Sequence, residues 1–100
     1  MLKVSIVGAS GYVGGELLRL LLDHPQVEVT QATSRGHMGE YIYQQHPNLR
    51  KRTALKFISP DVLEPCDVLF LALPHGEAQS RINRFAELAP AVVAGSRPVI

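Results

Sequence analysis

The chain of 100 residues contains one cysteine, Cys66, and no tryptophan. A single cysteine excludes an internal disulfide and a cluster of thiolate metal ligands. The longest apolar segment, residues 68–73, is far shorter than the about 20 residues that cross a bilayer. The first residues also lack the charged head and the cleavage site of a secretory signal. We therefore expect a cytoplasmic protein with no membrane partner.

The sequence also lacks a marked excess of charge of either sign. Ten Lys and Arg residues are balanced by nine Asp and Glu residues, for a net charge of +1. No basic run is long enough to follow a nucleic-acid backbone, so no nucleic-acid partner is expected. The densest basic stretch, residues 48–52, is interpreted as a solvated loop. The histidines share no metal-ligand spacing, which predicts solvated surface residues and no metal site; they are His24, His37, His46 and His75.

What the sequence does contain is a glycine-rich turn, residues 8–14, directly after the apolar run 3–7. Gly8, Gly11 and Gly14 lack the β-carbons that would block the turn, an approaching diphosphate and the packing of the next helix. The free amides and positive dipole end of that helix favour an anion, so the turn predicts a dinucleotide site. The alternative is a plain strand-to-helix turn. Apolar residues at helical spacing follow and define one face of the helix, namely Val13, Leu17, Leu20 and Leu21.

The end of the next predicted strand, residues 27–32, bears on which dinucleotide is bound. NAD-binding folds place an acidic residue on the ribose there, about 20 residues beyond the glycines. This chain instead has Thr33, Ser34, Arg35 and Gly36. A hydroxyl and a guanidinium can hold a 2′-phosphate, and a glycine allows close approach of the backbone, which favours NADP over NAD. The alternative is that Arg35 is merely solvated.

The rest of the chain continues the alternation of strands and helices. We expect a helical turn near residues 40–45, a short strand at 54–58, a helix start at 59–61, strands at 68–72 and 91–93, and a helix within 78–89. This order predicts an α/β, Rossmann-like doubly wound parallel sheet, of which the first half and the start of the second are present. Cys66 falls at the amino end of its strand, opposite the ligand edge, and is interpreted as structural.

Three blocks of the sequence resemble N-acetyl-γ-glutamyl-phosphate reductases and their lysine-branch relatives, which reduce aminoadipyl or glutamyl phosphate on a small acidic carrier protein. The blocks are residues 7–17, residues 33–35 with Gly39 and 46–50, and residues 71–76. The resemblance covers residues 2 to about 93, and residues 52–57 with 63–65 look closest to the lysine branch. It implies a domain over residues 1–93, cut short, and a tail over residues 94–100 that departs from the family pattern.

The resemblance implies an NADPH-dependent oxidoreductase that reduces an acyl phosphate to a semialdehyde in arginine or lysine biosynthesis. In that family a cysteine thiolate displaces phosphate to form a thioester, and NADPH then delivers a hydride to it. The nucleophilic cysteine and its histidine base belong to the second half of the family's chain. No catalytic residue therefore carries over, Cys66 matches neither position nor motif, and the 100 residues alone are expected to be inactive.

The family's cofactor contacts carry over to Gly8, Ser10, Gly11, Tyr12 and Val13 at the diphosphate, to Ser34, Arg35 and Gly36 at the 2′-phosphate, and to Pro74 and His75 nearer the nicotinamide. The full-length family is expected to form homo-oligomers. Two alternatives stay open: a stand-alone NADP(H)-binding module or inactive fragment, and a relative of aspartate-semialdehyde dehydrogenase.

Overall fold

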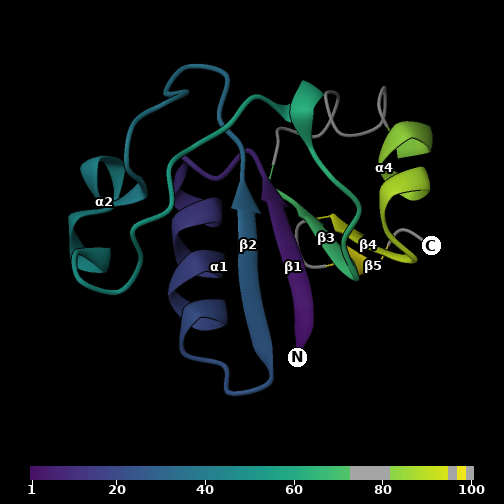
Figure 1. Cartoon of the computed structure of the whole chain (residues 1–100), viewed down its shortest axis with the longest axis horizontal. Helices are drawn as coiled ribbons and strands as arrows, with labels where there is room; N and C mark the ends of the chain where they lie inside the picture. Colours follow the sequence, from purple (N-terminus) through teal and green to yellow (C-terminus); the bar gives the residue numbers. More distant parts are fainter. Residues whose placement is uncertain (73–81, 95–96, 99–100) are drawn as a thin grey trace.

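Strands and helices alternate along the chain, as Figure 1 shows for the computed structural model, which describes residues 1–72, 82–94 and 97–98. The described strands are β1 (Leu2–Val7), β2 (Val27–Ala32), β3 (Val68–Leu71), β4 (Ala91–Ala94) and β5 (Arg97–Pro98). The described helices are α1 (Tyr12–Leu22), α2 (Ile42–Gln45) and α4 (Ile82–Leu88), with single 3-10 turns η1 (Pro47–Leu49) and η2 (Pro60–Val62). No helix in these ranges is long and apolar enough to span a membrane.

The strands form one sheet with the order β2-β1-β3-β4-β5. β1 pairs in parallel with β2 and β3, β3 pairs in parallel with β4, and β5 runs antiparallel to β4. After β2 the chain crosses to the other side of β1 to form β3, so the direction of winding reverses between these two strands. Such a switch point is where ligands bind in open α/β sheets. The predicted doubly wound, Rossmann-like fold is confirmed.

Each face of the sheet carries its own apolar core. Neighbouring residues of β1 point to opposite faces, so Ile6 belongs to one core and Val7 to the other, and both are at most 1% exposed. Figure 1 shows α1 and α2 on one side of the sheet and α4 on the other. The first core holds Ile6, Ala9, Leu18, Val29, Ala32, Ile42, Leu49 and Phe57, and the second holds Val7, Leu63, Leu69, Leu71, Phe85, Ala89 and Val92.

Helix α1 is rotated relative to the face that the sequence predicts. Its buried residues are Gly14 and Leu18, whereas Val13 is 50% and Leu20 is 56% exposed. The predicted face is therefore wrong at Val13 and Leu20. The close packing of Gly14 on the backbone of Ala9 sets the rotation of the helix, and the leucine one turn later then points into the core. Three further leucines pack partly buried beside it: Leu17, Leu21 and Leu22.

The strand predicted at residues 54–58 does not form. Two isolated bridges stand in its place, a parallel one between Ile58 and Thr33 and an antiparallel one between Lys56 and Tyr41. The segment at Thr33 pairs with this stretch in parallel and the segment at Tyr41 pairs with it in antiparallel orientation, so neither pairing extends beyond a single bridge. The helical turn near residues 40–45 is confirmed as α2, and the helix start at Ser59 is limited to the single turn η2, which the Ser59 hydroxyl caps.

Candidate functional site

The turn between β1 and α1 is fixed by the residue that follows β2. Gly8 has a φ of 79°, in the left-handed region that favours glycine. Its N–H donates to the Thr33 hydroxyl at 3.1 Å, and the N–H of Ala9 donates to the Thr33 carbonyl at 2.8 Å. Thr33 is only 1% exposed and donates its own N–H to Ile6 at 2.9 Å. The carboxyl ends of β1 and β2 are thereby joined into one rigid edge.

Helix α1 packs directly on this turn. A β-carbon at Gly14 would lie 2.6 Å from Ala9 Cα and 2.8 Å from the Gly8 carbonyl oxygen, far inside van der Waals contact. The packing role predicted for Gly14 is therefore confirmed. The first turn of the helix is held against the carboxyl end of β1. This is the switch point of the sheet, since β2 lies on one side of β1 and β3 on the other.

Among the residues that the structure describes, no side chain caps the N-terminus of α1, and the first turn carries no negative charge. The N-cap residue is Gly11. The Gly15 amide donates to Gly11 at 2.9 Å, so the amides before it have no partner inside the helix. A β-carbon at Gly11 would meet no atom of the described part of the chain within 4 Å, and Tyr12 is 82% exposed. These features fit the diphosphate of a dinucleotide, which needs free amides, positive polarity and room.

The loop after β2 lies against this turn. The Ser34 hydroxyl donates to that of Ser10 at 3.0 Å, and the Ser34 amide donates to Ile58 at 3.1 Å. Ser34 is 3% exposed, whereas Arg35 and Gly36 are exposed, and a β-carbon at Gly36 would meet nothing within 4 Å. The structure thus brings the two predicted groups of site residues together, and Arg35 is exposed to solvent next to them.

His46 belongs to this site, although the sequence predicts a solvated surface residue. The ring is half-buried, and its Nε2–H donates to the Ala9 carbonyl oxygen at 2.7 Å. A β-carbon at Gly15 would lie 2.6 Å from the ring. The surface interpretation of His46 is therefore wrong. The available signal was the second glycine in the first turn of α1, which the ring's position explains.

The other described histidines lie away from the turn. His24 is exposed near the end of α1, and His37 Nδ1 lies 3.0 Å from a carboxylate oxygen of Glu40. Hydrogen bonds from His37 and then from Gln45 hold the pKa of Glu40 below its ordinary value. Within the described residues, no three His, Cys, Asp or Glu side chains gather as metal ligands would.

Two further predicted features fall elsewhere. Cys66 lies just before β3, half-buried, with its thiol 3.5 Å from the Val68 carbonyl oxygen and packed against the second core. It therefore lies at the amino edge of the sheet, opposite the glycine turn. Pro74 and His75, expected near the nicotinamide, lie outside the described residues.

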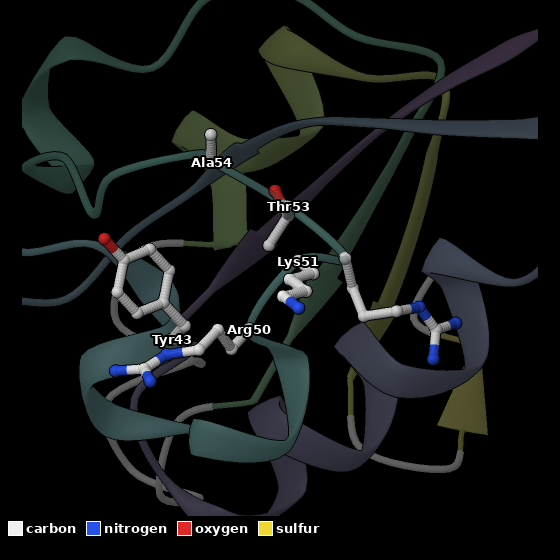
Figure 2. A pocket seen from close by; sticks show the side chains of 6 residues that line it. Tyr43, Arg50, Lys51, Thr53 and Ala54 are labelled. Carbon is white, nitrogen blue, oxygen red and sulfur yellow. The ribbon is translucent and has the colours of Figure 1, made fainter.

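A hollow beside α2 and η1 has none of the residues of the glycine turn in its lining. Figure 2 shows the residues that line it, which are Tyr43, Arg50, Lys51, Arg52, Thr53 and Ala54. The Cζ atom of Arg50 lies over the Tyr43 ring, 5.8 Å from its centroid. Arg52 forms an ion pair with Asp23, which caps the C-terminus of α1. The basic residues are exposed, as expected for a solvated loop.

The fold and the open helix terminus define a nucleotide-binding domain of the Rossmann type. Residues 3–97 match the sequence family described as "Semialdehyde dehydrogenase, NAD binding domain", and the chain belongs to that family.

Similar proteins include a [LysW]-L-2-aminoadipate 6-phosphate reductase of Thermomicrobium roseum, which is 59% identical over 93% of this chain. An N-acetyl-gamma-glutamyl-phosphate reductase of Methanocella arvoryzae is 54% identical over 80% of it. The chain spans 26% and 25% of the lengths of these two relatives. The resemblance drawn from the three sequence blocks is thereby confirmed.

The fold is also similar to that of a solved structure, an aspartate semialdehyde dehydrogenase with NADP from Candida albicans. The TM-score is 0.77 at 24% sequence identity, over 94% of this chain and 29% of that one. At this identity the likeness concerns the fold alone, which is the same doubly wound arrangement.

Proposed function

We propose that the chain is the NADP(H)-binding part of an oxidoreductase that reduces an acyl phosphate to a semialdehyde in arginine or lysine biosynthesis. One observation carries the proposal: the open N-terminus of α1 and the loop bearing Arg35 are joined by the 3.0 Å contact between Ser10 and Ser34. The diphosphate and the 2′-phosphate of NADP(H) are attached to the same ribose, at its 5′ and 2′ positions, so they need two anion sites side by side.

In the proposed complex the diphosphate lies on the first turn of α1, against Ser10, Gly11, Tyr12 and Val13, with Gly8 shaping the turn. The side chain of Arg35 contacts the 2′-phosphate, and Gly36 leaves room for the adenosine to approach. Ser34 is nearly buried and donates its hydroxyl to Ser10, so in this proposal it fixes the distance between the two phosphate sites. Pro74 and His75 are proposed to contact the cofactor near the nicotinamide. NADPH bound there would supply the hydride for the reduction.

The proposed substrate is an acyl phosphate, either N-acetylated or attached to a carrier protein. Relatives of this chain bear both kinds of name, and those named for carrier-borne aminoadipate or glutamate reach 59% identity. The nucleophile is assigned to the part of these relatives that the chain does not span, since Cys66 lies on the opposite edge of the sheet from the glycine turn. Homo-oligomerisation of the full-length enzyme is part of the same proposal.

Titration of the protein with NADPH, followed by cofactor fluorescence, tests the proposal. Arg35→Ala should weaken NADPH by about tenfold or more, the scale of a lost charge-assisted phosphate contact, and should leave NADH nearly unchanged. Arg50→Ala is the matched control, because it removes the same charge from the hollow beside α2 and should change neither affinity. Failure of the unaltered protein to bind NADPH, or equal weakening of both dinucleotides by Arg35→Ala, would contradict the assignment.

A further inference from the structure

His46 contacts the glycine turn through one short hydrogen bond, from its Nε2–H to the Ala9 carbonyl oxygen at 2.7 Å. We propose that His46 is a positioning residue that holds this turn in the conformation in which it binds a diphosphate. The inference rests on the proposed function and adds a residue from a distant loop to the cofactor site. It assigns His46 no contact with the ligand itself.

The backbone that carries the His46 ring is held by two hydrogen bonds of its own. His46 ends α2, where its N–H donates to the Ile42 carbonyl at 3.0 Å, and its own carbonyl accepts from Leu49 at 2.9 Å. Ile42 and Leu49 flank it in the chain and are both 0% exposed in the first core. Pro47 opens the next turn and further restricts the backbone of His46, so the corner between α2 and η1 fixes the point from which the ring reaches Ala9.

The acceptor, Ala9, is tied on both sides. Its N–H donates to Thr33 at 2.8 Å and its carbonyl accepts from His46, while its side chain is fully buried. The peptide unit is planar and trans, so the Ala9 carbonyl and the Ser10 N–H point in opposite directions. By fixing the carbonyl, His46 turns the Ser10 amide to the other side of the turn. Without that bond Ala9 remains tied to Thr33 through its N–H, but the Ala9–Ser10 peptide loses the contact that holds its carbonyl, so the direction of the Ser10 amide is less tightly set.

Gly15 supplies an independent observation. It lies in the first turn of α1, where glycine costs about 1 kcal/mol relative to alanine. A β-carbon there would lie 2.6 Å from both Cε1 and Nδ1 of His46. The glycine therefore makes room for the imidazole, and a substitution at either position should disturb the same contact.

The test compares His46→Ala, Gly15→Ala and the double variant for binding of NADPH, NADH and adenosine 2′-monophosphate. Both dinucleotides share the diphosphate, so His46→Ala should weaken NADPH and NADH by the same factor, about tenfold for one lost orienting hydrogen bond. Adenosine 2′-monophosphate has no diphosphate and should bind unchanged. His46→Gln retains a side-chain N–H donor and should recover part of the affinity, and the exposed His24→Ala is the matched control.

Because Gly15→Ala displaces the same ring, it should reproduce the His46→Ala pattern, and the double variant should bind no more weakly than the worse single variant. Should His46→Ala unfold, His46→Gln and Gly15→Ala decide the question by the same readout. Unchanged dinucleotide affinity in folded variants, or equal weakening of adenosine 2′-monophosphate, would overturn the inference. Failure of the unaltered protein to bind NADPH would instead overturn the proposed function.

Discussion

The hydroxyl of Ser34 donates to the hydroxyl of Ser10 at 3.0 Å, and this contact joins the loops that follow β1 and β2. Neither residue is adjacent to the other in sequence, and Ser34 is only 3% exposed. The pair sets the spacing between the N-terminus of α1 and the exposed guanidinium of Arg35. A ligand that spans both loops should therefore depend on the contact even where it does not touch it.

A double-mutant cycle on Ser10→Ala and Ser34→Ala should show coupling. Each single change leaves one hydroxyl without its partner, whereas the double change removes both, so the free energies of unfolding should be non-additive by about 1 kcal/mol. NADPH affinity should fall severalfold in each single variant. Urea denaturation and NADPH titration measure the two effects, and additive unfolding energies would show that the contact contributes nothing.

Gly14→Ala should destabilise the fold. The new methyl group would lie 2.6 Å from the backbone of Ala9, which cannot move without breaking the bond to Thr33. Overpacking of this kind costs about 1–3 kcal/mol, more than the about 1 kcal/mol that alanine gains in a helix. Thermal unfolding should show a lower melting temperature. Gly36→Ala, where the methyl group meets no atom within 4 Å, is the matched control, and equal stability of the two variants would refute the close packing.

The observed rotation of α1 predicts different costs for two leucines of the same helix. Leu18 is 0% and Leu20 is 56% exposed. Leu18→Ala should lower the free energy of unfolding by about 2–5 kcal/mol, because it opens a cavity in the first core. Leu20→Ala should cost under about 1 kcal/mol. Chemical denaturation of both variants measures the difference. A larger loss of stability in Leu20→Ala than in Leu18→Ala would contradict the observed rotation and support the helix face that sequence periodicity predicts.

Glu40 should make stability depend on acidity. Hydrogen bonds from His37 and from Gln45 lower the pKa of this carboxyl from 4.5, so the folded state holds its proton less tightly than the unfolded state. The contribution is complete above 4.5 and is lost as the pH falls through the lower folded-state value. Glu40→Gln should therefore be less stable than the unaltered protein at neutral pH, with the difference shrinking in acid. Denaturation across this range, with the exposed Glu28→Gln as control, measures it. A difference that stays constant with pH would contradict the role of Glu40.

The parallel sheet and the glycine turn could be predicted from the sequence because both depend on local patterns. β-branched runs predict strands, and a glycine at position 8 predicts the positive φ that the turn requires. The rotation of α1 could not be predicted in this way. It depends on how closely Gly14 approaches Ala9, and hydrophobic spacing alone carries no information about a backbone contact between separate elements.

The contact of His46 with the glycine turn could not be predicted from the sequence for a similar reason. Its hydrogen bond to Ala9 joins residues 37 positions apart, and a lone histidine in a loop is indistinguishable by sequence from a solvated one. The missing strand near Ile58 likewise follows from competition between Ala32 and Glu40, which bind successive backbone amides there. Local patterns predict elements well, whereas contacts between loops require the assembled sheet.

A crystal structure of the protein with NADPH would show directly where the diphosphate and the 2′-phosphate bind. We expect the diphosphate within hydrogen-bond distance of the first-turn amides of α1, at Gly11 to Val13, and the 2′-phosphate against the Arg35 guanidinium. Density for the cofactor in the hollow beside Tyr43 and Arg50, or a 2′-phosphate turned away from Arg35 into solvent, would contradict it.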